Sequence, residues 1–329
     1  MLSVGTAFVG RDWKLSCVLW KLTVLCGQLD RIRRKYEYIW KSRVLVNSYI
    51  PRSTNSTGNR DFLVLYREVV SLRILYLDIE TAPSNGWFWG LFKQNISIDN
   101  INEAGYTLCW SARWEGDKEI LFSSVHGDGE KVMVDRIHAL LSEADAVIHY
   151  NGTNFDIPIL NSEFFRRKMD PPTPYQQIDL LRTVRSRFRL VSNKLDWVAR
   201  ELGIGNKVHH KGMTLWHGCM AGVDKDWKVM EKYNKQDVNL LVKLYKLLLP
   251  WIQNHPNRGL YSDVIDKMGN PVTVCPNCGS IHLVRNGMEH LATQSYQRYK
   301  CADCGTPLRG RTTVLPIEKR RAIITTSKL

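Results

Sequence analysis

Four acidic residues, spread over three separate segments, have the spacing that a metal-dependent reaction centre needs. Asp78 and Glu80 lie two positions apart, Asp156 lies far downstream, and Asp237 follows Tyr233 by four positions. Carboxylate oxygens are the ligands that Mg²⁺ and Mn²⁺ prefer in proteins. Two such ions held side by side can promote hydrolysis of a phosphodiester bond. The segments therefore predict a two-metal site, provided that the fold brings them together.

The first two acids lie on a predicted strand that covers residues 73–81. Successive side chains of a strand point to opposite faces, so one face carries Ile74, Tyr76, Asp78 and Glu80. The other face is apolar and carries Leu75, Leu77 and Ile79. Apolar residues on both faces indicate a central strand. Two unpaired carboxylates at its end would repel each other unless a cation bound them; the alternative is an acidic pair turned to solvent.

Asp156 and Asp237 are each ambiguous when considered alone. Asp156 comes directly before an Ile-Pro pair, so it could cap the N-terminus of a helix instead of binding a metal. Asp237 falls within the apolar stripe of a predicted helix over residues 226–249, where a carboxylate needs a partner. Tyr233 lies one turn earlier on the same face. The alternative for Asp237 is a buried carboxylate satisfied by an arginine or by backbone donors.

The three segments together resemble the motifs of the DEDD 3′–5′ exonucleases of the ribonuclease-H-like superfamily. The first motif matches Asp78-Ile79-Glu80, the second matches Tyr150-Asn151 with Phe155-Asp156, and the third matches Tyr233 with Asp237. The tyrosine in the third motif is typical of the DEDDy class. Over residues 73–250 the chain is similar to exonucleases related to the proofreading domain of family B DNA polymerases, in particular phage-type members with a C-terminal zinc ribbon.

This resemblance implies two Mg²⁺ or Mn²⁺ ions in the active site. Asp78, Glu80 and Asp237 would hold the ion that activates the attacking water, and Asp78 would bridge to a second ion that Asp156 binds. Tyr233 would orient the water. The implied substrate is a single-stranded or frayed 3′ end of nucleic acid, with DNA favoured, and the implied setting is replication or repair. A DNA polymerase or replisome protein is a candidate partner.

Two alternative functions remain open. One is a ribonuclease with the same core, and the other is a nucleic-acid-binding protein with a degenerate nuclease core. The intact set of four acids and one tyrosine argues against the degenerate core.

The elements needed to position these residues can be predicted from periodicity and turn signals. Hairpin-like strands come first, and helices then alternate with strands, which is the order of a mixed α/β sheet with helices on its faces. The expected fold class is therefore a ribonuclease-H-like mixed sheet. The predicted strands cover residues 73–81, 106–114, 118–125 and 146–150, and the predicted helices cover residues 129–142, 156–169, 178–188, 193–202 and 226–249.

Four of the eight cysteines form two Cys-x-x-Cys-Gly pairs near the C-terminus, namely Cys275, Cys278, Cys301 and Cys304. Thiolates at this spacing wrap a tetrahedral Zn²⁺, and a site with four cysteines is structural because it is closed. The alternative is a redox pair or a fortuitous pattern. Basic residues alternate with Tyr296 and Tyr299 nearby, which indicates contacts with nucleic acid; a zinc ribbon that only docks another protein is the alternative.

The net charge of +14 is concentrated in the two ends of the chain. Residues 1–70 carry 12 Lys and Arg against 5 Asp and Glu, whereas residues 71–249 are nearly neutral. This distribution suits a catalytic core with flanking parts that bind a polyanion, although basic flanks can also serve solubility alone. No apolar run is long enough to span a membrane, and the scattered remaining cysteines fit a reducing compartment. We therefore expect a protein of the cytoplasm of a bacterium or of a phage-infected host.

Four regions are predicted. Residues 1–70 form a basic extension without a recognisable pattern, which is either disordered or translated from upstream of a mis-assigned start. Residues 71–255 form the exonuclease domain, residues 270–315 the zinc ribbon, and residues 316–329 a basic tail. Aromatic residues between the first two motifs could stack on a frayed 3′ end or could be ordinary core; they are Trp87, Phe88, Trp89 and Phe92.

Overall fold

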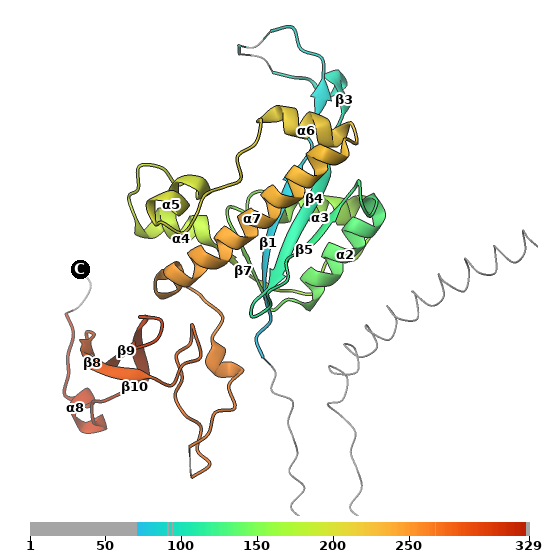
Figure 1. The fold of residues 1–329 in the computed structure, drawn as a ribbon. Helices are drawn as coiled ribbons and strands as arrows, with labels where there is room; N and C mark the ends of the chain where they lie inside the picture. The colour runs from blue at the N-terminus through green and yellow to red at the C-terminus, as the bar shows by residue number, and fades with distance from the viewer. Residues whose placement is uncertain (1–70, 91, 94, 267, 327–329) are drawn as a thin grey trace, which may run out of the picture. The chain divides into compact units, whose positions relative to one another are not determined.

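The computed structural model describes residues 71–90, 92–93, 95–266 and 268–326. The predicted extension over residues 1–70 lies outside these residues. Ahead of the C-terminal region, the described chain is built around one five-stranded sheet (Figure 1). Its strand order is β5-β4-β1-β6-β7, with bounds Leu121–Ser124, Thr107–Trp114, Ile74–Thr81, Ala146–His149 and Gln176–Asp179.

Strand β1 is central, as the apolar residues on both of its faces predict. It pairs antiparallel with β4 on one side and parallel with β6 on the other. Ile74 and Tyr76 are buried in one core cluster, and Leu75 and Leu77 are buried in another. Each face of the sheet therefore packs against its own layer of helices, and the mixed α/β sheet predicted from the sequence is confirmed.

The long helix α7, Asp224–Leu248, packs against the β1 face that carries Ile74 and Tyr76. Figure 1 shows this helix running across the sheet. Helices α4, Leu180–Arg187, and α5, Leu195–Glu201, contribute to the same cluster. The acid-bearing face of β1 is thus the face that looks toward α7.

Two helices cover the opposite face of the sheet. Helix α2, Glu130–Glu143, and helix α3, Asp156–Arg166, bury their apolar stripes against the Leu75 and Leu77 side of β1. Because Asp156 is the first residue of α3, its position depends on how this layer joins the sheet.

The structure differs from the prediction in three places. Residues 176–179 form strand β7, although the sequence predicts helix from residue 178. Helix α6, Met213–Met220, was not predicted. A short hairpin also projects after β1, formed by β2, Asn85–Gly86, and β3, Ile101–Glu103, with the 3₁₀ turn Ile98–Asn100 between them.

The C-terminal region forms a separate three-stranded antiparallel sheet, which we call the C-terminal sheet. Its order is β10-β9-β8, with bounds Pro307–Thr313, Ser295–Cys301 and Leu283–His290, and the helix α8, Ile317–Arg321, follows it. The connection to the core begins with the 3₁₀ turns Leu249–Trp251 and Arg258–Leu260. Among the described residues, no helix combines the length and apolar character needed to cross a membrane.

Candidate active site

Three of the four predicted acids converge between β1 and α7. Asp78 and Glu80 approach from the end of β1, and Asp237 approaches from the middle of α7. Each contributes a carboxylate oxygen, and these three oxygens lie within 4.8 Å of one another. We call this group the carboxylate cluster.

The charges in this cluster are not balanced by the protein alone. Burial, and then the charge of Asp237, raises the pKa of Asp78 well above its usual range. The same two causes raise the pKa of Glu80 to about 8. In addition, Asp237 Oδ1 is buried without any hydrogen-bond partner among the described residues. Oxygen ligands with unbalanced negative charge fit a hard divalent cation such as Mg²⁺ or Mn²⁺.

Tyr233 and Lys207 lie at the edge of the carboxylate cluster. Lys207 Nζ forms an ion pair with Asp237 Oδ2 and lies 3.1 Å from the Tyr233 hydroxyl. Burial lowers the pKa of Lys207, but Asp237 more than offsets this effect, so the ammonium remains protonated. Burial, followed by the charge of Asp237, raises the pKa of Tyr233. The tyrosine is therefore a neutral phenol that can donate a hydrogen bond.

Asn234 holds Asp78 from the same helix. Its Nδ2 donates to Asp78 Oδ2 at 2.7 Å and to the Asp78 carbonyl oxygen at 3.3 Å. The side chain is fully buried, so few other orientations are open to it. Neither Asn234 nor Lys207 was predicted from the sequence. The only available signal for Asn234 was its place in the motif beside Tyr233, on the buried side of α7.

Asp156 lies beside the carboxylate cluster but outside the group of three. Its Oδ1 accepts a hydrogen bond of 3.1 Å from the backbone N–H of Ile79, between the two acids of β1. Its charge is close enough to raise the pKa of both Asp78 and Glu80. Burial raises the pKa of Asp156 itself to about 7, although the Ile79 N–H opposes this shift. The capping alternative does not describe this geometry, because the side chain of Asp156 bonds to β1.

The turn between β6 and α3 explains how Asp156 reaches this place. Asn151 has a φ of 69°, a left-handed conformation that asparagine tolerates better than most residues. The backbone of Gly152 donates to His149 Nδ1 at 3.0 Å, and a Cβ on this glycine would lie 2.3 Å from the imidazole ring. The chain can therefore turn this sharply only with glycine at this position.

A cavity of about 590 Å³ opens beside Asp78 and Lys207. Its wall includes two further cationic side chains, Arg185 and Lys194, which come from α4 and from the residue just before α5. The other lining residues are Tyr150, Leu181, Asn193, Leu195 and Asp196. A negatively charged strand could thus approach the carboxylate cluster along a wall that carries positive charge.

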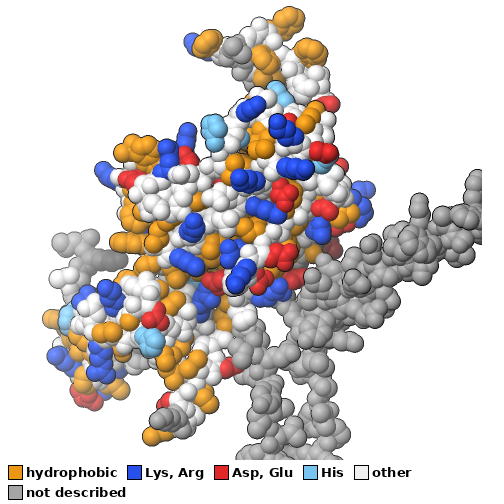
Figure 2. Space-filling model, viewed as in Figure 1, with side chains coloured by type: hydrophobic (Ala, Val, Ile, Leu, Met, Phe, Trp, Pro, Cys, Tyr) orange, Lys and Arg blue, Asp and Glu red, His pale blue; other side chains and the backbone are white. Residues whose placement is uncertain are grey.

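The aromatic residues after β1 are not core residues. Trp87 is 75% exposed, Trp89 is 98% exposed and Phe92 is 89% exposed. Apolar side chains gather at the end of the molecule that carries this hairpin (Figure 2). This exposure contradicts the interpretation of these residues as ordinary core, and it leaves the rings of Trp87 and Trp89 accessible for stacking.

His210 and Trp216 belong instead to the wall of the site. The His210 ring lies 4.8 Å from the Tyr233 ring and 5.1 Å from the Trp216 ring, as measured between centroids. The Trp216 ring also lies 6.1 Å from the Tyr233 ring, so both rings pack edge to face against Tyr233 and restrict its movement.

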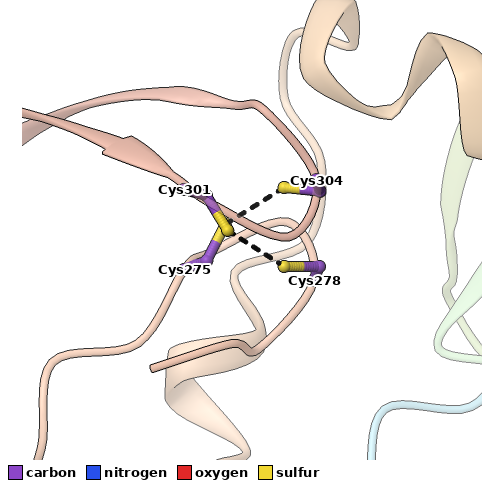
Figure 3. A group of neighbouring side chains, drawn as sticks. All are labelled: Cys275, Cys278, Cys301 and Cys304. Atoms are coloured by element: carbon purple, nitrogen blue, oxygen red, sulfur yellow. Dashed lines mark hydrogen bonds between the residues drawn. The ribbon is translucent and has the colours of Figure 1, made fainter. Parts of the chain in front are cut away.

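A second candidate metal site lies in the C-terminal region. The sulfur atoms of Cys275, Cys278, Cys301 and Cys304 lie within 4.8 Å of one another (Figure 3). Two of the sulfur pairs, Cys275–Cys304 and Cys278–Cys301, are separated by 3.6 Å. A tetrahedral site with Zn–S bonds of about 2.3 Å requires sulfur atoms about 3.8 Å apart. The four thiols therefore fit a zinc ion.

Comparison with known proteins gives one family match. Residues 102–249 match the sequence model of the RNase_H superfamily. This range contains Asp156, Tyr233 and Asp237 but begins after Asp78 and Glu80. Together with the five-stranded mixed sheet, the match confirms the predicted ribonuclease-H-like fold class. No curated protein matches the sequence.

Among solved structures, the family B DNA polymerase from the hyperthermophilic archaeon Pyrobaculum calidifontis is similar to part of this chain. The similarity covers 54% of this chain and 25% of the polymerase, with 17% sequence identity and a TM-score of 0.42. This chain thus matches only a quarter of that polymerase's length.

Proposed function

We propose that this protein is a metal-dependent 3′–5′ exonuclease that hydrolyses phosphodiester bonds of nucleic acid, with DNA as the favoured substrate. The observation that carries this proposal is the carboxylate cluster, in which three acids from two distant segments face one another with unbalanced charge. The RNase_H superfamily match supports a nuclease in general. The polarity and the preference for DNA rest on the resemblance of the motifs.

Asp78, Glu80 and Asp237 would hold divalent cations, with Asp156 as a further oxygen donor beside them. Bound Mg²⁺ or Mn²⁺ would stabilise negative charge on the phosphate and lower the pKa of a bound water. The neutral hydroxyl of Tyr233 can donate a hydrogen bond to the attacking water or to a phosphate oxygen. The Lys207 ammonium, 3.1 Å from that hydroxyl, adds positive charge where the phosphate would gain negative charge.

The surroundings suit a single strand rather than a paired duplex. Arg185 and Lys194 line the cavity beside Asp78 and can contact backbone phosphates. The exposed rings of Trp87 and Trp89 follow the acid-bearing strand closely in sequence and can stack on unpaired bases. Stacking on a base requires that the base has left its partner, which favours a single-stranded or frayed 3′ end.

The test uses single-stranded DNA and RNA of the same sequence, labelled at the 5′ end, with Mg²⁺. We expect a ladder of products that shorten from the 3′ end, and we expect Asp78→Asn and Asp237→Asn to lower the rate by about 10³-fold or more. Thermal unfolding of each variant controls for folding. Cleavage of RNA alone would instead support a ribonuclease. Wild-type rates in both variants would refute the proposed site.

We also propose that Cys275, Cys278, Cys301 and Cys304 bind one structural Zn²⁺. Four thiolates leave no open position for a water, so this ion would stabilise the C-terminal sheet without taking part in hydrolysis. Purified protein should contain one zinc per chain, and a Cys301→Ser variant should lose it while keeping the Mg²⁺-dependent activity on short substrates.

A further inference from the structure

We propose that one face of the C-terminal sheet is a second nucleic-acid-binding surface, which holds the phosphodiester backbone independently of the carboxylate cluster. We call it the basic face and define it by Tyr296, Arg298, Lys300 and Arg309. Binding at this face does not depend on hydrolysis, so the proposal goes beyond the exonuclease activity and stands even without it.

The register of the sheet gathers these residues on one face. Tyr296, Arg298 and Lys300 alternate along β9, so their side chains leave the strand on the same side. Arg298 lies opposite Arg309 of β10. Because residues directly opposite in an antiparallel pair share a face, Arg309 joins the three residues of β9.

The three cations of the basic face are exposed and only weakly neutralised. Arg298 and Lys300 form no ion pair with any described residue, and both are exposed. Arg309 alone has an acidic neighbour, with its NH1 atom 3.1 Å from Glu289 Oε1. Three positive charges against one negative charge, on an accessible surface, are complementary to a phosphate backbone.

Arg309 is also held in place by an aromatic ring. Its guanidinium carbon lies 4.6 Å from the centroid of the Tyr296 ring. A guanidinium stacked on a ring loses less freedom when it binds a phosphate, because its plane is already oriented. Tyr296 therefore positions Arg309 on this face, and a bound phosphate would meet a pre-arranged donor.

The opposite face of the sheet has a different character. Leu283, Tyr299 and Leu308 lie on it and are partly buried. Lys and Arg side chains are visible over β8–β10 and α8 in Figure 2, and α8 adds three consecutive basic residues at positions 319–321. Arg285 lies opposite Tyr299 and is therefore a single cation on this second face, whereas three cations share the basic face.

The C-terminal sheet is attached to the core through the end of α7. Asn277 Nδ2, in the first cysteine pair, donates to the Leu249 carbonyl oxygen at 2.8 Å. Arg258, in the connection, contacts both carboxylate oxygens of Glu115 at 2.7 Å. From Asp237 to Leu249 the helix rises by about 18 Å at 1.5 Å per residue.

The test measures binding of a labelled single-stranded DNA oligonucleotide, by fluorescence anisotropy, to full-length protein carrying Asp78→Asn and without Mg²⁺. The variant R298Q/K300Q/R309Q is compared with a control, K131Q/R136Q/K168Q, which removes the same charge from exposed positions on and after α2 and α3. Each phosphate contact on a single strand contributes about 0.7 to the slope of log K against log salt concentration. We expect the first variant to reduce that slope by about 2 and to weaken binding about tenfold or more at low salt, and the control to change neither.

Conservative exchange gives a second check. The variant R298K/K300R/R309K keeps the charges, so it should retain the slope, and it should lose less affinity than the glutamine variant because only the stacked guanidinium is lost. If the triple glutamine variant loses its zinc, the single substitution K300Q, at an exposed position, is tested in its place. The expected loss in slope is then about 0.7. Equal weakening by the control variant, or no change in the first variant or in K300Q, would overturn the proposal. A longer RNA or duplex DNA in place of the single strand then identifies the preferred form of the polyanion.

Cleavage separates this proposal from the proposed function. With Asp78 intact, the glutamine variant should cleave a trinucleotide at the wild-type rate, because so short a substrate reaches only the carboxylate cluster. Its rate on a long strand should fall at substrate concentrations well below saturation. A protein with no nuclease activity could still pass the binding test, and a nuclease could still fail it.

Discussion

At the scale of single residues, Lys207 and Asn234 complete the carboxylate cluster from two different directions. Lys207 comes from the loop between α5 and α6 and pairs with Asp237. Asn234 comes from α7 and holds Asp78. Both set the charge and orientation of acids that would otherwise be free to reorient or to take up a proton.

Replacing Lys207 by glutamine should shift the pH dependence of cleavage. Burial raises the pKa of Asp237, and Lys207 partly offsets that rise. Without the ammonium, the pKa of Asp237 rises further, so a higher pH is needed to form the carboxylate that binds a metal. We expect the acidic limb of the pH–rate profile to move to higher pH and the maximal rate to fall about tenfold or more. Lys211→Gln, on an exposed neighbour, serves as the control, and an unmoved acidic limb in Lys207→Gln would contradict this role.

Replacing Asn234 by alanine should weaken the hold on Asp78 without removing a proposed ligand. A hydrogen bond to a charged group contributes about 1.5–3 kcal/mol, so we expect a loss of about tenfold to 100-fold in kcat. We also expect more Mg²⁺ to be needed for half-maximal rate, while the KM for the strand stays the same. Asn239→Ala on the same helix is the matched control. A changed KM with an unchanged Mg²⁺ requirement would assign Asn234 to strand binding instead.

At the scale of elements, alternation and periodicity predicted those parts of the site that lie on regular structure. The acids of β1 share a face because a strand has a period of two, and Asp237 is inward because it interrupts an apolar helical stripe. Tyr233 and Asp237 are accordingly buried on one side of α7. Leu247, near the end of the same helix, is nevertheless 48% exposed, because it lies at the edge of the apolar stripe, whereas Leu244 and Leu248 are buried nearer its centre.

Strand β7 and Lys207 were not predicted, because neither belongs to a segment with a clear strand or helix periodicity in the sequence. Strand β7 has four residues, begins with two exposed glutamines and ends at Asp179, which caps α4 directly. Its pattern therefore merges with that of the helix. Lys207 lies in a loop, and only tertiary packing brings it to Asp237. No pattern of neighbouring residues could have indicated that approach.

Whether the turn between β6 and α3 positions Asp156 can be tested by adding a single methyl group at Gly152. Gly152→Ala would place a Cβ against the buried imidazole of His149, so the turn or the ring must move. Overpacking of this kind costs about 1–3 kcal/mol, which corresponds to a fall in Tm of several degrees, about 2–4 °C per kcal/mol. Cleavage activity should fall by more than the loss of folded protein explains, because a shift of the turn also displaces Asp156 from the site. Gly127→Ala, whose Cβ would approach only the Ser124 hydroxyl, should change Tm little; equal effects of the two would refute this argument.

At the scale of the whole molecule, a chain with excess positive charge contains a site that concentrates negative charge. The chain carries a net charge of +14, yet burial raises the pKa of Asp78, Glu80, Asp156 and Asp237. The charges of Asp237 and Asp156 add to this effect at Asp78 and Glu80. A fold that keeps such acids together is less stable than it would be with the repulsion relieved. The net positive charge of the chain attracts a polyanion, whereas the buried acids of the site need cations to relieve their repulsion. These are separate properties of the same protein.

The raised pKa values of the buried acids predict how pH and Mg²⁺ together affect the stability of the fold. Unfolded Asp and Glu have pKa values of about 3.9 and 4.3, whereas folded Asp156 and Glu80 have values of about 7 and about 8. Between these limits the folded state binds more protons than the unfolded state, so the stability of the metal-free protein falls as the pH rises from about 4 to about 8. Mg²⁺ binds the deprotonated acids and competes with protons at the acidic end of this window.

Thermal unfolding with and without Mg²⁺ measures the effect. A Mg²⁺ concentration 100-fold above its Kd adds about 2.7 kcal/mol, so at about pH 8 we expect a rise in Tm of about 5–10 °C. At about pH 5 the rise should be small, because protons occupy the acids. Chelators are avoided, since they would also remove zinc from the cysteine thiolates, which Mg²⁺ itself does not bind well. The double variant D78N/D237N should lose the Mg²⁺ response at both pH values. A rise in Tm that is equal at the two pH values, or that survives in the double variant, would mean that Mg²⁺ stabilises the protein elsewhere than at the carboxylate cluster.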